Sequence, residues 1–420
     1  MNTIAVIIVM ILIVDVLLNF TADILNLRQL RGDLPSEFEQ WYDAQRYRKS
    51  QVYLRVNTRF GWVTAIVNLM VLFTFWFGGG FAYLDQWVRS LQVAPVLSGL
   101  VFFAVLVLIK GIISQPFHLY DTFVIEERFG FNQTTLKTYL LDLIKELILG
   151  SVIGGILLSA ILLFFQYTGA NAWWACWLVV VGFMLLMQYI APTWIMPLFN
   201  RFEPLPEGQL RDAITAYARR IDFKLDNIFM MDGSKRSAKS NAFFSGFGRH
   251  RRIVLFDTLI EKHSVAELVA VLAHEMGHFK KKHILKMMLI GILQAGIMFY
   301  ILSWFISYPG LFEAFYVPQP SIYAGLVFFS ILFSPIETIV GIGVQYLSRR
   351  NEFEADRFAV STAPQKEALA QALKRLCVDN LSNLQPHPFY VFLHYSHPPV
   401  LQRIKAMQTN GATVRELELQ

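Results

Sequence analysis

The hydrophobic pattern of this chain consists of long apolar runs separated by polar connections. Seven of these runs are long enough to cross a hydrocarbon core of about 30 Å, for which a helix needs roughly 20 residues. They are Thr3–Phe20, Trp62–Leu84, Ala94–Ile113, Leu147–Phe165, Trp173–Ile195, Ile284–Ile306 and Ile322–Leu347. The pattern predicts an integral membrane protein that is mainly α-helical.

The first run has a second interpretation, because an apolar N-terminal stretch can be a cleaved signal peptide. However, it lacks a basic N-terminal region, contains Asp15 and has no clear small-residue cleavage site. We therefore expect this run to be a membrane helix.

Composition supports the membrane class. Of 420 residues, 55% are hydrophobic and 16% are charged, which is more apolar than the usual globular mix. The two cysteines, Cys176 and Cys377, have no paired spacing. Neither a disulfide framework nor a cysteine-based zinc site follows from them.

The formal net charge of +6 is unevenly distributed over the connections. Lys and Arg are frequent in the first, third and fifth connections and in the C-terminal tail, whereas the second holds only Arg89. The positive-inside rule then places the odd-numbered connections and the C-terminus in the cytoplasm. A lipid bilayer is the expected partner of these charges, and we predict no nucleic-acid partner.

The runs and connections divide the chain into four predicted segments. These are 1–199, with five spans and their loops; 200–283, a cytoplasmic region; 284–347, with two spans; and 348–420, a second cytoplasmic region. The two cytoplasmic regions are large enough to hold a folded site. We expect them to fold against each other at the membrane surface.

Short periodic elements are predicted in the first cytoplasmic region. Leu210–Ile221 has the pattern of an amphipathic helix. Asn227–Met231, Ala242–Gly246 and Ile253–Phe256 are apolar runs separated by polar or glycine-containing turns, which indicates a small β-sheet.

The helix that follows carries the strongest chemical signal in the chain. Ser264 and Glu267 have the spacing of a capping box, and the helix they start includes His274-Glu275-Met276-Gly277-His278. Residues four apart share one helix face, so both imidazoles can reach one metal ion. Neutral imidazole is a common ligand of Zn²⁺.

Glu275 lies about 100° around the helix from His274, beside the two histidines but displaced from them. This position suits a general base that acts on a metal-activated water. A chance H-E-x-x-H on a surface helix is the alternative, and we estimate its frequency at on the order of one per cent.

A catalytic zinc needs a third protein ligand. The densest acidic group downstream contains Glu352, Glu354 and Asp356. Glu352 and Asp356 are four apart, so one helix leaving the last span could present a ligand and a supporting carboxylate together. Glu354 competes with Glu352 as the ligand, and an ordinary acidic surface beside Arg349 and Arg350 is equally compatible with the spacing.

Taken together, these motifs resemble the type I CAAX prenyl protease family. The resemblance covers nearly the whole chain and rests on the seven spans, Ser240–Phe244, His274–His278, Glu352–Asp356 and His397-Pro398-Pro399. It implies seven transmembrane helices that enclose a chamber, with a zinc metalloprotease region containing a small β-sheet on the cytoplasmic side.

The resemblance also implies roles for individual residues. One Zn²⁺ per chain would be bound by His274, His278 and Glu352. Glu275 would be the general base, and Asp356 would orient a ligand histidine.

Two further segments receive roles from the same resemblance. His397 would hydrogen-bond the oxyanion of the tetrahedral intermediate, although the prolines after it also fit a plain surface turn. Asn241, Ala242 and Phe243 would lie along the bound peptide substrate, although an asparagine at a strand end needs no such role.

The implied activity is removal of the C-terminal tripeptide from prenylated proteins by a zinc endopeptidase. Short loops and a compact tail favour a bacterial member, located in the inner membrane with the active site facing the cytoplasm. Two alternatives remain open: a broad-specificity quality-control metalloprotease of the membrane, and a non-hydrolytic zinc-binding transporter or scaffold.

Overall fold

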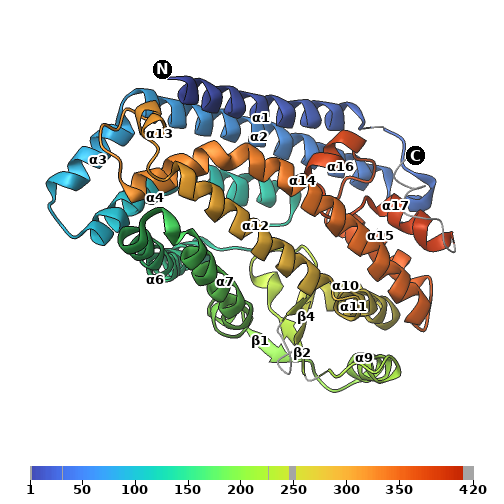
Figure 1. The fold of residues 1–420 in the computed structure, drawn as a ribbon. Helices are drawn as coiled ribbons and strands as arrows, with labels where there is room; N and C mark the ends of the chain where they lie inside the picture. Colours follow the sequence, from blue (N-terminus) through green and yellow to red (C-terminus); the bar gives the residue numbers. More distant parts are fainter. Residues whose placement is uncertain (1, 31, 226, 246–251, 410–420) are drawn as a thin grey trace.

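The computed structural model describes residues 2–30, 32–225, 227–245 and 252–409. Within these residues, seven helices are long and apolar enough to cross a membrane. They are α1 (Thr3–Arg28), α2 (Ala44–Phe77), α4 (Pro95–Tyr120, continued to Phe129), α6 (Leu136–Thr168), α7 (Trp173–Ile190, continued to Phe199), α12 (His283–Phe305) and α14 (Ile322–Thr362). The predicted helical membrane fold is confirmed (Figure 1).

The second predicted span, Trp62–Leu84, was wrong at its C-terminal end. Helix α2 ends at Phe77, and α3 (Gly80–Ser90) begins after Gly79, whose φ of 76° is left-handed. Glycine adopts this conformation without the Cβ clash that other residues meet. The apolar run continues through the break, so hydrophobicity alone does not reveal it.

The long helices pack tightly only near one end. One apolar core joins the start of α1 to the end of α2 and the start of α14, and it contains Ile8, Trp76 and Phe328. In contrast, only 6–17% of the most apolar window of each long helix is buried. A solid bundle would bury one face of every helix along its length. The seven helices therefore pack together at one end and leave most of their surface outside this core, which accords with the predicted chamber.

A small mixed sheet lies beside the helices. Its strands are β1 (Phe202–Pro204), β2 (Asn227–Met231), β3 (Ala242–Ser245) and β4 (Arg252–Phe256), in the order β1-β2-β4-β3. Strands β2 and β4 are parallel and the other two pairs are antiparallel. Three strands match predicted runs, whereas the short β1 was not predicted; α9 (Gln209–Arg220) matches the predicted amphipathic helix.

Helix α11 (Val265–Lys280) carries the H-E-x-x-H sequence and begins with the predicted capping box. The Glu267 amide donates to Ser264 Oγ at 3.3 Å, and the Ser264 amide donates to Glu267 Oε2 at 2.7 Å. Most of α11 is buried, because it packs against α9, α14 and α15 (Ala368–Asp379). One apolar core thus contains residues from both segments that were predicted to be cytoplasmic, 200–283 and 348–420.

Gly277 sets how closely α11 approaches α14. A Cβ atom at this position would lie 3.1 Å from Phe358 Cδ1, 3.2 Å from the Ala355 carbonyl oxygen and 3.3 Å from Ala355 Cα. Two of these atoms belong to the backbone of α14 and cannot rotate away. The absence of a side chain at Gly277 therefore lets the histidine helix reach the acidic residues of α14.

We expect Gly277→Ala to lower the free energy of unfolding by about 1–3 kcal/mol, the usual cost of overpacking a tight contact. Gly150→Ala is the matched control, since a Cβ atom there meets nothing within 4 Å. Thermal unfolding of the two variants in detergent measures the difference. Equal stability of the two variants would contradict the assigned close contact.

Candidate metal centre

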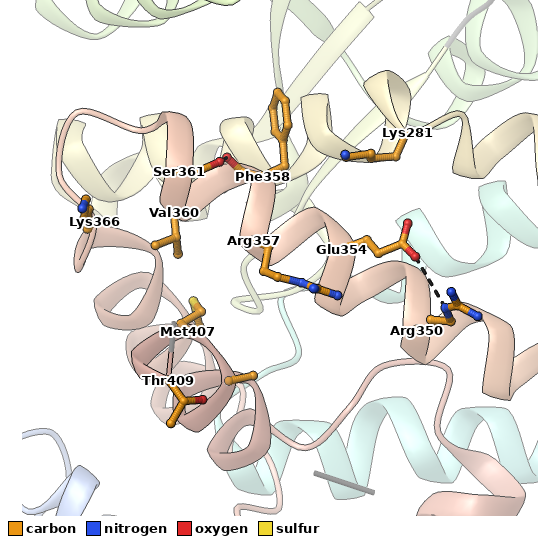
Figure 2. A pocket seen from close by; sticks show the side chains of 11 residues that line it. Lys281, Arg350, Glu354, Arg357, Phe358, Val360, Ser361, Lys366, Met407 and Thr409 are labelled. Carbon is orange, nitrogen blue, oxygen red and sulfur yellow. Dashed lines mark hydrogen bonds and ion pairs between the residues drawn. The ribbon is translucent and has the colours of Figure 1, made fainter. Parts of the chain in front are cut away.

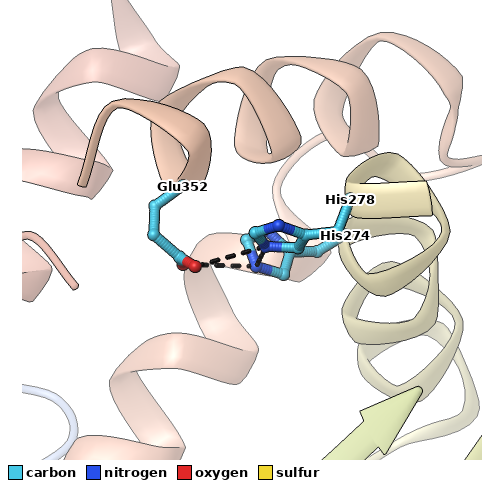
Figure 3. Close-up of side chains that lie close together, drawn as sticks. All are labelled: His274, His278 and Glu352. Atoms are coloured by element: carbon cyan, nitrogen blue, oxygen red, sulfur yellow. Dashed lines mark hydrogen bonds and ion pairs between the residues drawn. The ribbon is translucent and has the colours of Figure 1, made fainter. Parts of the chain in front are cut away.

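Three electron-pair donors converge between α11 and α14 (Figure 3). His274 Nε2 and His278 Nε2 are 3.1 Å apart. Glu352 Oε1 lies 3.2 Å from His278 Nε2, and Glu352 Oε2 lies 3.4 Å from His274 Nε2. Among the described residues, these three form the group whose geometry could hold a metal ion.

The spacing of these atoms fits a tetrahedral zinc site. Zinc binds imidazole nitrogen and carboxylate oxygen at about 2.0–2.2 Å, which places neighbouring ligand atoms about 3.3–3.5 Å apart around a tetrahedron. The observed separations of 3.1–3.4 Å come close to this value. Moreover, Glu352 Oε2 is buried and accepts no hydrogen bond from the described residues, as expected of an oxygen reserved for a cation.

The competing ligand, Glu354, points elsewhere. Its Oε2 atom lies 3.2 Å from His283 Nε2 and its Oε1 atom lies 3.5 Å from Arg350 Nε. Because Glu352 and Glu354 are two apart on α14, they leave the helix in different directions. The structure thus places Glu352, and not Glu354, against the two histidines.

Asp356 faces the ring of His274. Its Oδ1 atom lies 2.9 Å from His274 Nδ1, which keeps a proton on Nδ1 and leaves the Nε2 lone pair facing Glu352. Without a cation, burial opposes protonation of His274, but the Asp356 and Glu352 carboxylates beside it outweigh the effect of burial and raise the pKa of this histidine to about 9. A positive charge at this point is therefore favoured, whether a proton or a metal ion supplies it.

Arg403, on α17 (Val400–Gln408), was not predicted as part of the site. Its guanidinium group donates to both carboxylate oxygens of Asp356, at 2.8 Å and 2.6 Å, and Nη1 lies 3.4 Å from Glu352 Oε2. All three side chains are buried. Arg403 thus balances two buried carboxylates and ties α17 to α14. The sequence held no signal for it beyond its place six residues after His397.

Glu275 lies on the same turn as His274 but takes no part in this network. Its side chain is half-buried, and within the described chain its carboxylate has no hydrogen-bond or ion-pair partner. Burial raises its pKa above the ordinary glutamate value, and the nearby histidines only partly offset this. A carboxylate with a raised pKa and no partner is suited to accepting a proton near neutral pH.

His397 lies at the open side of the group. Its Nε2 atom is 3.4 Å from Glu352 Oε1, and its side chain is 63% exposed. Ser396 Oγ lies 2.9 Å from Nδ1, which helps to fix the ring. Buried Arg349 donates to the Tyr395 carbonyl at 2.6 Å and so holds the segment that carries His397.

The segment Asn241–Phe243 lies at the edge of the sheet. Strand β3 pairs with β4 on one side and packs against α11, while its other edge has no strand partner within residues 227–245 and 252–409. Asn241 is exposed, and its Oδ1 atom accepts a hydrogen bond from the Ala242 amide at 2.8 Å. Phe243 packs edge-on against Phe256. Strand β3 therefore lies beside the histidine helix and has one unpaired edge among the described residues.

The fold and this group of residues define a multi-pass membrane metallopeptidase, and comparison with known proteins agrees. Residues 23–201 match the family model "CAAX prenyl protease N-terminal, five membrane helices", and residues 204–410 match Peptidase family M48.

Known relatives narrow the class to one family. The chain is 33% identical to the mouse CAAX prenyl protease 1 homolog, with 89% of this chain and 88% of the relative covered. It is 32% identical to CAAX prenyl protease 1 of Saccharomyces cerevisiae, again with 89% of this chain and 88% of the relative covered. The crystal structure of S. mikatae Ste24p superposes with a TM-score of 0.92 at 31% identity, covering 97% of this chain and 99% of that one. This protein therefore belongs to the type I CAAX prenyl protease family of M48 metalloendopeptidases.

We expect Arg403→Met to lower the free energy of unfolding of the metal-free protein by about 3–5 kcal/mol, because it leaves Asp356 and Glu352 buried without a compensating charge. Arg46→Met is the control: Arg46 also pairs with a carboxylate, Asp379 at 3.0 Å, but is 45% exposed. Its loss should cost about 0–1 kcal/mol. Denaturant unfolding in detergent with a chelator present compares them, and similar losses for both would refute the role assigned to Arg403.

Proposed function

We propose that this protein is a zinc-dependent endopeptidase in which His274, His278 and Glu352 hold one zinc ion. The observation that carries the proposal is the convergence of two imidazole nitrogens and one carboxylate at 3.1–3.4 Å. The M48 family membership implies a metal and supports the same conclusion. When bound, zinc would polarise the scissile carbonyl and lower the pKa of a water molecule towards about 7.

The remaining chemistry belongs to residues around this group. Glu275, which has no partner, takes the proton of the attacking water and delivers it to the leaving amine. His397 donates from Nε2 to the oxyanion of the tetrahedral intermediate; its exposed ring beside Glu352 supports this assignment. One such donor typically lowers the barrier by about 2.7–4 kcal/mol. Asp356 and Arg403 hold His274 and Glu352 in place.

The free edge of β3 is the proposed binding site for the substrate. An extended peptide can add to an open strand edge through main-chain hydrogen bonds. Ala242 would supply these bonds at the free edge, because the Phe256 amide donates to the Asn241 carbonyl and the main-chain groups of Asn241 and Phe243 therefore face β4. Phe243 would lie along the peptide, and the exposed Asn241 amide nitrogen would hold one substrate carbonyl. The packing of β3 against α11 supports this placement, since a peptide added to β3 would lie near the helix that carries Glu275.

We infer the substrate class from the relatives, which carry the name CAAX prenyl protease 1. A prenylated C-terminal CAAX peptide is the proposed substrate, and its lipid would enter the chamber between the helices. The distribution of Lys and Arg supports a cytoplasmic active site. Short connections favour a bacterial source and therefore the bacterial inner membrane.

Product analysis tests the substrate class. The purified protein is offered a prenylated CAAX peptide and the same peptide without the lipid, each with and without a chelator, and the products are identified by mass spectrometry. We expect release of the C-terminal tripeptide from the prenylated peptide alone, abolished by the chelator. Equal cleavage of both peptides at several bonds would instead indicate a broad-specificity membrane protease, and no cleavage by zinc-loaded protein would indicate a transporter or scaffold.

Glu275→Gln should retain zinc and lose about 10²–10⁴-fold in turnover, because the amide cannot accept the proton of water. Glu261→Gln, on the neighbouring helix α10 (Asp257–Lys262), is a matched control that touches none of the proposed site. Zinc content and initial rates measure the two effects separately. A Glu275→Gln variant that cleaves at the wild-type rate would disprove the assigned base.

A further inference from the structure

His283 is buried although no motif predicted a role for it. It is the first residue of α12, and its exposed fraction is 1%. Between α11 and α12, Lys282 adopts a left-handed conformation with φ of 59°. This conformation is strained for a residue that carries a side chain. The sharp turn directs His283 back against the histidine helix.

His283 bridges the second histidine of the proposed metal site to α14. Its Nδ1 atom lies 3.1 Å from His278 Nδ1, and its Nε2 atom lies 3.2 Å from Glu354 Oε2. A continuous chain of side chains thus runs from Glu354 through His283 to His278. It joins three helices, α14, α12 and α11.

The positions of the protons along this chain of side chains follow from Glu354, its outermost member. The Glu354 carboxylate also pairs with Arg350, so it is ionised and can only accept a hydrogen bond. His283 Nε2 must therefore carry a proton, which leaves Nδ1 of the neutral ring as an acceptor. His278 Nδ1 must then donate to it. The lone pair of His278 Nε2 is left free and faces His274 and Glu352.

We propose that His283 is a positioning residue that fixes the tautomer and ring orientation of His278 for metal binding, with Glu354 anchoring it. The inference rests on the proposed metal site. Each histidine of H-E-x-x-H then has a hydrogen-bond partner at Nδ1. Asp356 is the partner of His274, and His283, anchored by Glu354, is the partner of His278. Partners of this kind typically change metal affinity by 10–100-fold.

The Glu354 end of this chain of side chains is partly exposed to solvent, whereas His283 at its centre is buried. Glu354 lines a cavity of about 900 Å³ together with Lys281, Arg350 and Arg357 (Figure 2). Of these cations, Arg350 pairs with Glu354, which favours the ionised form of the carboxylate. The buried ring of His283 lies between Glu354 and His278 and contacts both.

Zinc affinity of the purified full-length protein, measured by competition with a chromophoric chelator, tests the proposal. His283→Leu removes the acceptor at similar volume and should weaken zinc binding by about 10–100-fold. His283→Asn keeps an acceptor near the Nδ1 position and should recover most of that loss. Glu354→Leu removes the partner of His283 Nε2 and should give a smaller loss of zinc affinity. If His283→Leu does not fold, Glu354→Leu provides the test.

Arg357→Gln is the control, because Arg357 lies on the same face of α14 but contacts neither His283 nor Glu354 by a hydrogen bond or ion pair. The midpoint of thermal unfolding in chelator should change little in His283→Asn, which separates metal positioning from general packing. Wild-type affinity in both His283→Leu and Glu354→Leu, or no recovery in His283→Asn, would overturn the proposal. If wild-type protein bound no zinc, or His274→Ala bound it equally well, the proposed metal site itself would fail.

Discussion

The structure around α11 and α14 depends on one electrostatic constraint: two imidazole lone pairs and a carboxylate face one another at 3.1–3.4 Å. Three electron-rich groups at this distance repel one another unless a positive charge lies between them. The surrounding residues help to meet this constraint by contacting the ligand side chains away from the point where the three groups converge. Asp356 accepts a hydrogen bond from His274 Nδ1 and His283 accepts one from His278 Nδ1, and Arg403 neutralises the carboxylates.

The arrangement of the helices follows from the same requirement. α14 is 41 residues long, so at 1.5 Å per residue it extends about 60 Å, roughly twice the hydrocarbon thickness. Its first half belongs to the apolar core that closes one end of the helices, and its second half carries Glu352 and Asp356. Because Gly277 lets α11 lie close against this second half, a rigid membrane helix positions the acidic ligand. The site therefore lies on the second half of α14, beyond the apolar core that joins the helices.

Much of this architecture could be predicted from sequence because its signals are local. Apolar runs define the spans, the Ser264–Glu267 spacing defines the start of α11, and the four-residue spacing of the histidines defines a shared face. The geometry also brings Glu352 and Asp356 to the positions that their spacing allowed. These features need only the period of a helix and the length of a membrane span.

The residues that sequence reasoning missed act through contacts between distant segments. Arg403 reaches Asp356 across 47 positions, and Glu354 reaches His283 across 71. Neither pair has a spacing that a single helix or strand would impose. The end of α2 was missed for a different reason, since a left-handed glycine interrupts the helix while the chain stays apolar. Without the three-dimensional structure, Glu354 remained a competing ligand; its contact with His283 gives it another partner.

The most direct measurement of the central claim is an anomalous difference map from crystals of the zinc-loaded protein, recorded at the zinc absorption edge. The account predicts one peak per chain, bounded by His274 Nε2, His278 Nε2 and the Glu352 carboxylate. A peak beside Glu354 and His283 instead, or no peak between α11 and α14 in active protein, would contradict it.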